Sequence, residues 1–181
     1  MRAFVGIPIP ETWIPPLMRA SGRLPGGRSV EADDLHVTLA FLDDQPEDRL
    51  EALHEALEIR PLPSARLRPL SFAPFGSRPS LVALDLAPDP DLGALRDAVR
   101  TAARVAGIDL PRERFRPHVT LRRFPKSHPP SPRLSAALAG LGVPDMEPAP
   151  AALVTLWSST LGPGGPLYEP LASYPLAVRI V

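Results

Sequence analysis

The sequence predicts an α+β fold made of two similar lobes. Candidate strands and helices interleave without the regular alternation that a doubly wound parallel sheet requires. Short segments rich in Pro and Gly separate several of the strands, which favours hairpins and antiparallel pairing. A four-residue motif, HVTL, occurs at residues 36–39 and again at residues 118–121. A gene duplication is the simplest account of this repeat, so we expect residues 1–181 to form one domain with two related halves.

The strands are predicted from short runs rich in β-branched and aromatic residues that Pro or Gly closes. The run at residues 35–42 is the clearest of them, and residues 162–165 (GPGG) supply the turn of a closing hairpin. The predicted strands cover residues 2–9, 35–42, 65–72, 81–87, 115–124, 152–158 and 168–178.

The helices are predicted from apolar residues at helical spacing, such as Leu50, Leu53 and Leu57. Asp44 is a candidate N-cap for the helix that carries these three leucines, and Gly107 stands where the C-terminal cap of the next helix belongs. The predicted helices cover residues 12–21, 46–59, 91–106 and 134–141.

Composition excludes several classes of function. The chain has 20 basic and 20 acidic residues, so it has no global positive field. This argues against a polybasic protein that coats nucleic acid. Its arginines are scattered along the sequence rather than clustered. The absence of cysteine excludes disulfides, thiolate zinc sites and a cysteine nucleophile. No apolar run is long enough to span a bilayer and no targeting segment is apparent, so we expect a cytoplasmic protein without membrane association.

The repeated motif places the same chemistry on two strands. Residues i and i+2 of a strand point to the same face, so His36 lies beside Thr38 and His118 lies beside Thr120. The other face of the first strand carries Leu35, Val37, Leu39 and Phe41, which we expect in the core. Each strand therefore presents an imidazole and a hydroxyl from an apolar support.

Two imidazoles and two hydroxyls that converge on one group suit in-line displacement at phosphorus. A neutral imidazole accepts a proton from water while a protonated one donates to the leaving oxygen, and the hydroxyls donate to the non-bridging oxygens. This chemistry needs no metal and no cofactor. Two alternatives remain open: the pairs are ordinary solvent-facing strand residues, or the histidines bind zinc, although no Cys or acidic residue stands at ligand spacing in either motif.

The motifs and their surroundings resemble the 2H phosphoesterase superfamily, and most closely its RNA 2′,3′-cyclic phosphodiesterases, also called 2′-5′ RNA ligases. The similarity is carried by residues 34–42 (DLHVTLAFL) and 116–123 (RPHVTLRR). Residues 2–5 (RAFV) and the closing segment 158–168, with its Ser, Pro/Gly turn and Tyr, resemble the family as well. One departure is that residues 28–31 (RSVE) carry no aromatic side chain where the family often has one.

The resemblance implies two lobes related by a pseudo-two-fold axis, with the motifs in the cleft between them. It implies that His36 donates a proton to the leaving 3′ oxygen, that His118 accepts a proton from water, and that Thr38 and Thr120 hold the phosphate. The family often carries Arg five residues after the second His, which is Arg123 here.

Strict strand alternation instead puts Arg122 on the face of His118. A bulge or the end of the strand would reconcile the two, so Arg123 is the favoured phosphate ligand and Arg122 is the alternative. The other two histidines are assigned no role in the site. We expect His54 on the flank of a helix and His128 in a loop.

The predicted function is metal-independent hydrolysis of an RNA-terminal 2′,3′-cyclic phosphate to a 2′-phosphate end. The predicted partner is such an RNA end or a cyclic nucleotide, with no obligate protein partner and a monomeric state. Two alternatives remain. One is a 2H-type enzyme acting on small nucleotide cyclic phosphates or 2′-5′ linkages, including reversible ligation. The other is an RNA-end-binding module that has lost turnover, against which the intact His and Thr of both motifs speak.

Overall fold

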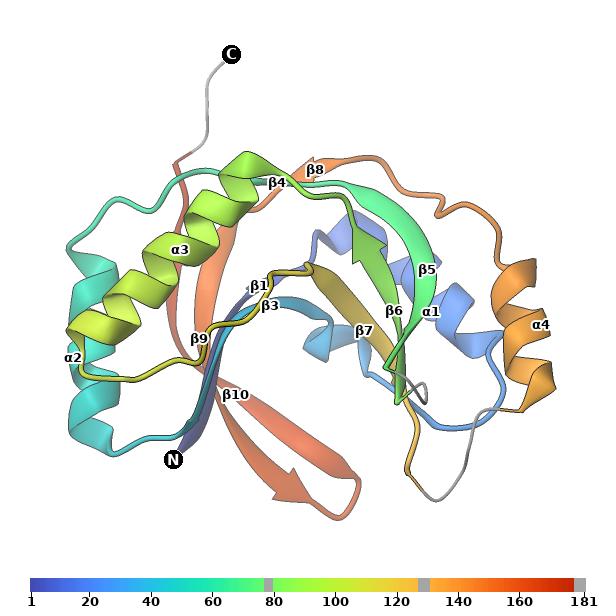
Figure 1. Ribbon diagram of the computed structural model, residues 1–181, viewed down its shortest axis with the longest axis horizontal. Helices are drawn as coiled ribbons and strands as arrows, with labels where there is room; N and C mark the ends of the chain where they lie inside the picture. Colours follow the sequence, from blue (N-terminus) through green and yellow to red (C-terminus); the bar gives the residue numbers. More distant parts are fainter. Residues whose placement is uncertain (77–79, 127–130, 178–181) are drawn as a thin grey trace.

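The computed structural model describes residues 1–76, 80–126 and 131–177, and it shows two groups of antiparallel strands that meet at the motif strands (Figure 1). The strands form one continuous sheet in the order β10-β9-β1-β3-β7-β6-β5, and β2 pairs with β7 off this path. β4 and β8 form a separate two-stranded sheet. The strands are β1 (Arg2–Pro8), β2 (Arg28–Ser29), β3 (His36–Asp44), β4 (Arg66–Leu67), β5 (Pro69–Phe75), β6 (Leu81–Leu86), β7 (His118–Arg123), β8 (Ala149–Pro150), β9 (Leu153–Gly162) and β10 (Gly165–Pro175).

The two motif strands join the two halves of the sheet. β3 belongs with β1, β9 and β10, whereas β7 belongs with β6, β5 and β2. β3 and β7 run antiparallel, and Val37 pairs with Val119 as their one registered residue pair. Because these valines hold the same position in the two HVTL motifs, the pseudo-two-fold relation between the halves passes through this pair. The predicted α+β class is confirmed.

The helices cover the outer faces of both halves. They are α1 (Ile14–Gly22), preceded by the 3-10 turn Glu11–Trp13, α2 (Glu47–Glu58), α3 (Pro90–Val105) and α4 (Pro132–Gly140), with a second 3-10 turn at Ala32–Asp34. α2 and α3 pack on each other and on the β3 half, and α1 packs on β7 (Figure 1). In the described residues no helix is long and apolar enough to cross a membrane.

Local sequence accounts for how the helices begin and end. Asp89 caps α3 because its side chain accepts from the amides of Asp91 and Leu92 at 2.9 and 3.2 Å. Gly107, with a φ of +80°, follows α3 and supplies the left-handed residue that ends it. α1 carries Pro in its first turn, where the missing amide costs no hydrogen bond.

Several local predictions differ from the structure. Asp44 is not an N-cap, because β3 continues to that residue and Pro46 takes the cap position of α2 without a side-chain bond. The strand predicted at residues 65–72 is divided between β4 and β5, since β4 turns away to pair with β8. The two-residue strands β2 and β8 are too short to leave a pattern in the sequence. His128 lies outside the described residues, as do residues 178–181 at the end of the last predicted strand.

Candidate active site

The backbone fixes both imidazoles in the same orientation. Nδ1 of His36 lies 2.6 Å from the carbonyl oxygen of Asp34, and Nδ1 of His118 lies 2.7 Å from the carbonyl oxygen of Arg116. A carbonyl oxygen can only accept, so Nδ1 carries the proton in each ring. In each neutral ring, Nε2 is therefore left as the group that can accept a proton, and in each protonated ring it is the group that can donate one.

Aromatic side chains enclose His36. Its ring centroid lies 4.8 Å from that of Phe4, 5.4 Å from that of Trp157 and 5.6 Å from that of Tyr168, which meets it edge-on. Nε2 lies 3.1 Å from Oγ1 of Thr38, so the hydroxyl donates to the neutral ring. Burial lowers the pKa of His36 to about 4, against the opposing effect of the Asp34 carbonyl.

His118 has a more polar environment. Its ring packs on Phe75 at 4.4 Å between centroids, and it pairs across the sheet with Asp85 of β6. Asp85 also accepts from Nη2 of Arg116 at 2.9 Å, and the Arg116 guanidinium lies over the Phe75 ring. Burial lowers the pKa of His118, while the Arg116 carbonyl and the carboxylate of Asp85 oppose that shift.

A cavity of about 350 Å³ brings the motif residues of the two strands together. Thr38 of β3 and His118, Thr120 and Arg123 of β7 all line it. His36 does not line this cavity, but its Nε2 contacts the hydroxyl of Thr38, which does. The positive charges of Arg123 and His118 contribute to the low pKa of His36, so the three groups are close enough to interact electrostatically.

A bulge at the same place in each motif decides which side chains face this cavity. Thr38 pairs with Gly6 and the next paired residue is Ala40, so Leu39 is passed over in the register of β1 and β3. Thr120 pairs with Ala83 and the next paired residue is Arg122, so β7 passes over Leu121. A bulge of one residue reverses the alternation beyond it.

This reversal answers the question left open between Arg122 and Arg123. Arg123 is exposed and lines the cavity. Arg122 instead donates to the carbonyl oxygens of Gly26 at 2.8 Å and Ser21 at 2.9 Å, which ties β7 to the last turn of α1 and to the segment after it. The prediction that Phe41 is in the core is wrong for the same reason: Phe41 is 49% exposed and lines the cavity, while Ala40 is buried in its place.

Sequence reasoning missed Phe75, Asp85 and the contribution of Arg116. Phe75 and Asp85 come from β5 and β6, and the register of β6 against β7 brings Asp85 to His118, whereas Arg116 stands only two residues before His118. Trp157 was also missed, whereas Tyr168 lies in the closing segment that carries the family resemblance. His54 lies on α2, remote from these residues in the fold, and its Nδ1 is 2.9 Å from the hydroxyl of Tyr174.

The described part of the chain contains no group of three His, Asp or Glu side chains placed to hold a metal ion. The motif residues themselves supply imidazole, hydroxyl and guanidinium groups, a set that suits an anionic phosphate. The expectation of a metal-free reaction remains a prediction, because only a measurement of activity tests it.

The fold and its paired His-x-Thr strands define a phosphoesterase of the 2H class. A model of the 2′-5′ RNA ligase superfamily matches residues 10–155. The chain belongs to this superfamily, and the predicted family is confirmed.

Known proteins similar to the chain agree with this assignment. An RNA 2′,3′-cyclic phosphodiesterase of Thermus thermophilus is 31% identical, over 97% of this chain and 90% of that protein. One of Geobacillus stearothermophilus is also 31% identical over 87% of this chain, which spans only about half, 50%, of that longer protein. The crystal structure of Escherichia coli LigT complexed with NADP⁺ superposes with a TM-score of 0.77 at 25% identity, covering 98% of each chain.

Proposed function

We propose that the protein hydrolyses RNA-terminal 2′,3′-cyclic phosphates to 2′-phosphate ends, using His36 and His118 as acid and base without a metal ion. The relatives named above as RNA 2′,3′-cyclic phosphodiesterases support the substrate. The observation that carries the mechanism is the matched orientation of two imidazoles on adjacent strands. Each has Nδ1 bound to a carbonyl oxygen and Nε2 left for proton transfer.

The reaction breaks the bond between phosphorus and O3′. His118 accepts a proton from water, whose oxygen attacks phosphorus opposite O3′. His36 donates its Nε2 proton to O3′ as that bond breaks, leaving a 3′ hydroxyl and a 2′-phosphate. Thr38 and Thr120 donate to the non-bridging oxygens, and Arg123 supplies the positive charge that their growing negative charge requires.

The enclosure of His36 means that this ring must gain a proton before it can act as the donor. A group whose pKa is about 4 is neutral in the free protein at pH 7, yet a proton donor must be protonated. An anionic substrate beside Arg123 would offset the positive charges that lower this pKa and would favour the protonated ring. His36 is therefore proposed to take up its proton together with the substrate.

The test is incubation of the purified protein with adenosine 2′,3′-cyclic phosphate, with the 2′- and 3′-phosphate products resolved by chromatography. We expect adenosine 2′-phosphate, and we expect the rate to survive EDTA because two imidazoles suffice for the proton transfers. Loss of activity on chelation with recovery on added zinc or manganese would contradict the metal-free mechanism. Formation of the 3′-phosphate would contradict the assigned leaving oxygen.

Binding of the cyclic phosphate without turnover would instead favour the RNA-end-binding module. For ligation, the corresponding test is an RNA with a 2′,3′-cyclic phosphate end and a partner with a 5′ hydroxyl end. The 5′ oxygen would attack phosphorus and O3′ would leave as a hydroxyl, so a 2′-5′ junction is the product that would show it.

A further inference from the structure

We propose that a second subsite beside Arg123 binds the 5′ phosphate of the terminal nucleotide and the base that precedes it. The protein would then act on RNA chains in preference to nucleoside cyclic phosphates. This inference rests on the proposed function and extends it to the length of the substrate.

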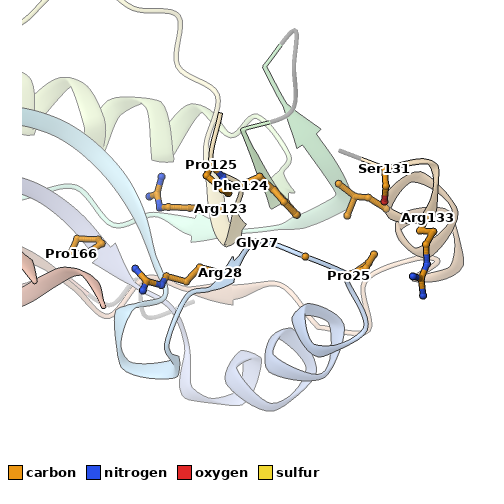
Figure 2. A pocket seen from close by; sticks show the side chains of 11 residues that line it. Pro25, Gly27, Arg28, Arg123, Phe124, Pro125, Ser131, Arg133 and Pro166 are labelled. Carbon is orange, nitrogen blue, oxygen red and sulfur yellow. The ribbon is translucent and has the colours of Figure 1, made fainter. Parts of the chain in front are cut away.

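The subsite is a hollow of about 780 Å³ between β7, the segment before β2, and α4 (Figure 2). Arg123 lines both this hollow and the cavity of the motif residues, so the two are adjacent through one guanidinium. The hollow is also lined by two further cationic side chains and one aromatic side chain, those of Arg28, Arg133 and Phe124. A volume of this size is within the range of small-molecule and cofactor sites.

The charge of the hollow is positive. Among the described residues, none of those that line it is acidic, and the nearby Glu31 and Asp34 line the neighbouring small hollow instead. Arg28 and Arg133 are exposed, and in the described part of the chain neither makes an ion pair. Guanidinium groups bind phosphate through paired N–H donors, so an unpaired cluster of them beside a phosphate site favours a second phosphate.

Arg28 and Arg123 form the part of the cluster nearest the motif residues. In Figure 2 both side chains extend toward Pro166, which belongs to the β9–β10 hairpin. The Arg28 guanidinium lies against Gly165, where a Cβ atom would clash with its Nη1. A glycine at this position, whose φ is +112°, leaves the space that Arg28 occupies.

Phe124 lines the hollow between the arginines, and it is half-buried because it packs against the apolar cluster of Leu24, Val82 and Leu134. Figure 2 shows it with Arg28 and Arg123 on one side and Arg133 on the other. Gly27 lies directly against the Phe124 ring, since a Cβ atom there would stand 2.8 Å from two ring carbons. The φ of Gly27, +67°, also favours glycine at this position. An aromatic ring among cations is the usual platform for a base of single-stranded RNA.

A smaller hollow of about 90 Å³ adjoins both, since it shares Arg28 and Arg123 with the wide hollow and Arg123 with the cavity of the motif residues. Glu31 and Asp34 also line it, so negative charge disfavours a phosphate there. The second phosphate is therefore assigned to the side of Arg28 that faces the wide hollow.

A second group of arginines leads away from the motif residues in another direction and fits a nucleotide less well. Arg116 is paired with Asp85 at 2.9 Å, and Arg96 donates to the carbonyl oxygen of Glu113 at 3.0 Å. Glu113, which is acidic, also lines the cavity of the motif residues. The guanidinium groups of Arg116 and Arg96 already have these partners, whereas neither Arg28 nor Arg133 makes an ion pair within residues 1–76, 80–126 and 131–177.

Three substrates separate the parts of this proposal: adenosine 2′,3′-cyclic phosphate, its 5′-phosphorylated form, and the dinucleotide ApA with a 2′,3′-cyclic phosphate end. We expect kcat/KM to rise about tenfold when the 5′ phosphate is added, the gain that one charged hydrogen bond supplies. We expect a further rise of about tenfold for the dinucleotide, from stacking of the second base.

Two variants assign these gains to residues. Arg28→Gln should cancel the gain from the 5′ phosphate, and Phe124→Leu should cancel the further gain of the dinucleotide. Arg60→Gln is the matched control, because Arg60 is exposed beside a separate hollow near Tyr174 and should leave both gains unchanged. Thermal unfolding of each variant shows that it is folded.

Equal kcat/KM on the three substrates would overturn the subsite and leave the proposed function standing. Arg114 is exposed and belongs to the second group of arginines, since it lines the cavity of the motif residues with Arg96 and Arg116. A gain that persists in Arg28→Gln and disappears in Arg114→Gln would overturn the assignment and place the RNA chain on that group. Failure to hydrolyse any of the three substrates would overturn the proposed function and this inference together.

Discussion

The β3 half and the β7 half of the sheet hold their histidines with the same backbone device and surround them with different chemistry. Both rings bond through Nδ1 to the carbonyl oxygen two residues earlier, and both strands bulge one residue after the Thr. The β3 ring lies among Phe4, Trp157 and Tyr168. The β7 ring lies near the Asp85–Arg116 ion pair.

The residues at the equivalent position after the two bulges differ in the same way as the surroundings of the two rings. Phe41 follows the bulge in β3, and Arg123 follows the bulge in β7. The β3 side is thus apolar and the β7 side is charged. Two chemically identical imidazoles need different environments if one is to donate a proton and the other to accept one. The two halves supply different environments, and the enclosure of His36 favours its neutral form until a substrate binds.

The largest expected effect comes from removing either imidazole. His36→Ala and His118→Ala should each lower kcat on a cyclic phosphate by about 10²–10⁴-fold, the usual contribution of a positioned acid or base. A nitrophenyl phosphodiester separates their roles, because its leaving group needs little protonation.

On the nitrophenyl substrate His36→Ala should recover much of its activity, while His118→Ala stays impaired. Steady-state rates of both variants on both substrates make the comparison. If the two stay equally impaired, or if His118→Ala is the one that recovers, the roles assigned to the two halves are wrong even though the site is right.

The next effect distinguishes neighbouring arginines. Arg123→Gln should lower kcat/KM by about 10²-fold, the loss expected for one donor to a developing anion, and should leave the melting temperature unchanged because the side chain is exposed. Arg122→Gln should leave kcat/KM per folded molecule largely unchanged and should lower the stability of the protein. The two bonds of Arg122 to backbone carbonyls are structural, so the free energy of unfolding should fall by about 1–3 kcal/mol.

Rates per folded molecule and chemical denaturation of the two variants check this prediction. A rate lost in Arg122→Gln and kept in Arg123→Gln would mean that the bulge does not decide which arginine meets the phosphate.

The repeat made the motif strands predictable, but the bulges were not. His36, Thr38, His118 and Thr120 could be placed on common faces because strand alternation is a local rule. Leu39 and Leu121 are ordinary strand residues, and the bulge at each arises from pairing with a neighbouring strand that is distant in sequence. Strict alternation therefore failed for Phe41 and left Arg122 and Arg123 undecided.

The surroundings of the histidines were also beyond local rules. Asp85 meets His118 only through the register of β6 on β7, and nothing near Asp85 in the sequence marks it as a partner. In the same way, Arg28 and Arg133 stand more than 100 residues apart and meet at one hollow only after folding. A scattered set of arginines in the sequence thus becomes a local positive patch in space.

A smaller effect is expected from the hydroxyls. Thr38→Val and Thr120→Val keep the β-branched shape and remove one donor each, so kcat/KM should fall by about tenfold in each case. Thr38 also donates to Nε2 of His36, and its loss should therefore change the pH dependence as well as the rate. A pH profile that changes for Thr120→Val and not for Thr38→Val would contradict the contact between Thr38 and His36.

The smallest expected effect tests the charged side of the comparison through Asp85. Its carboxylate opposes the burial that lowers the pKa of His118, and it neutralises Arg116, whose positive charge lowers that pKa further. Asp85→Asn removes both effects, so the pKa of His118 should fall. If His118 is the base, it must be neutral to act. The limb of the kcat profile that rises with pH should then move to lower pH, by a shift of up to about one unit, because kcat reports the substrate complex, in which His36 is proposed to be protonated.

The matched control is Asp97→Asn, because Asp97 is largely exposed and forms only a loose pair with Arg96 at 4.0 Å. It should leave the rising limb in place. A limb that stays fixed in Asp85→Asn would assign that titration to a group other than His118. A limb that moves to higher pH would contradict the sign of the interaction, since losing a neighbouring negative charge can only favour the neutral imidazole.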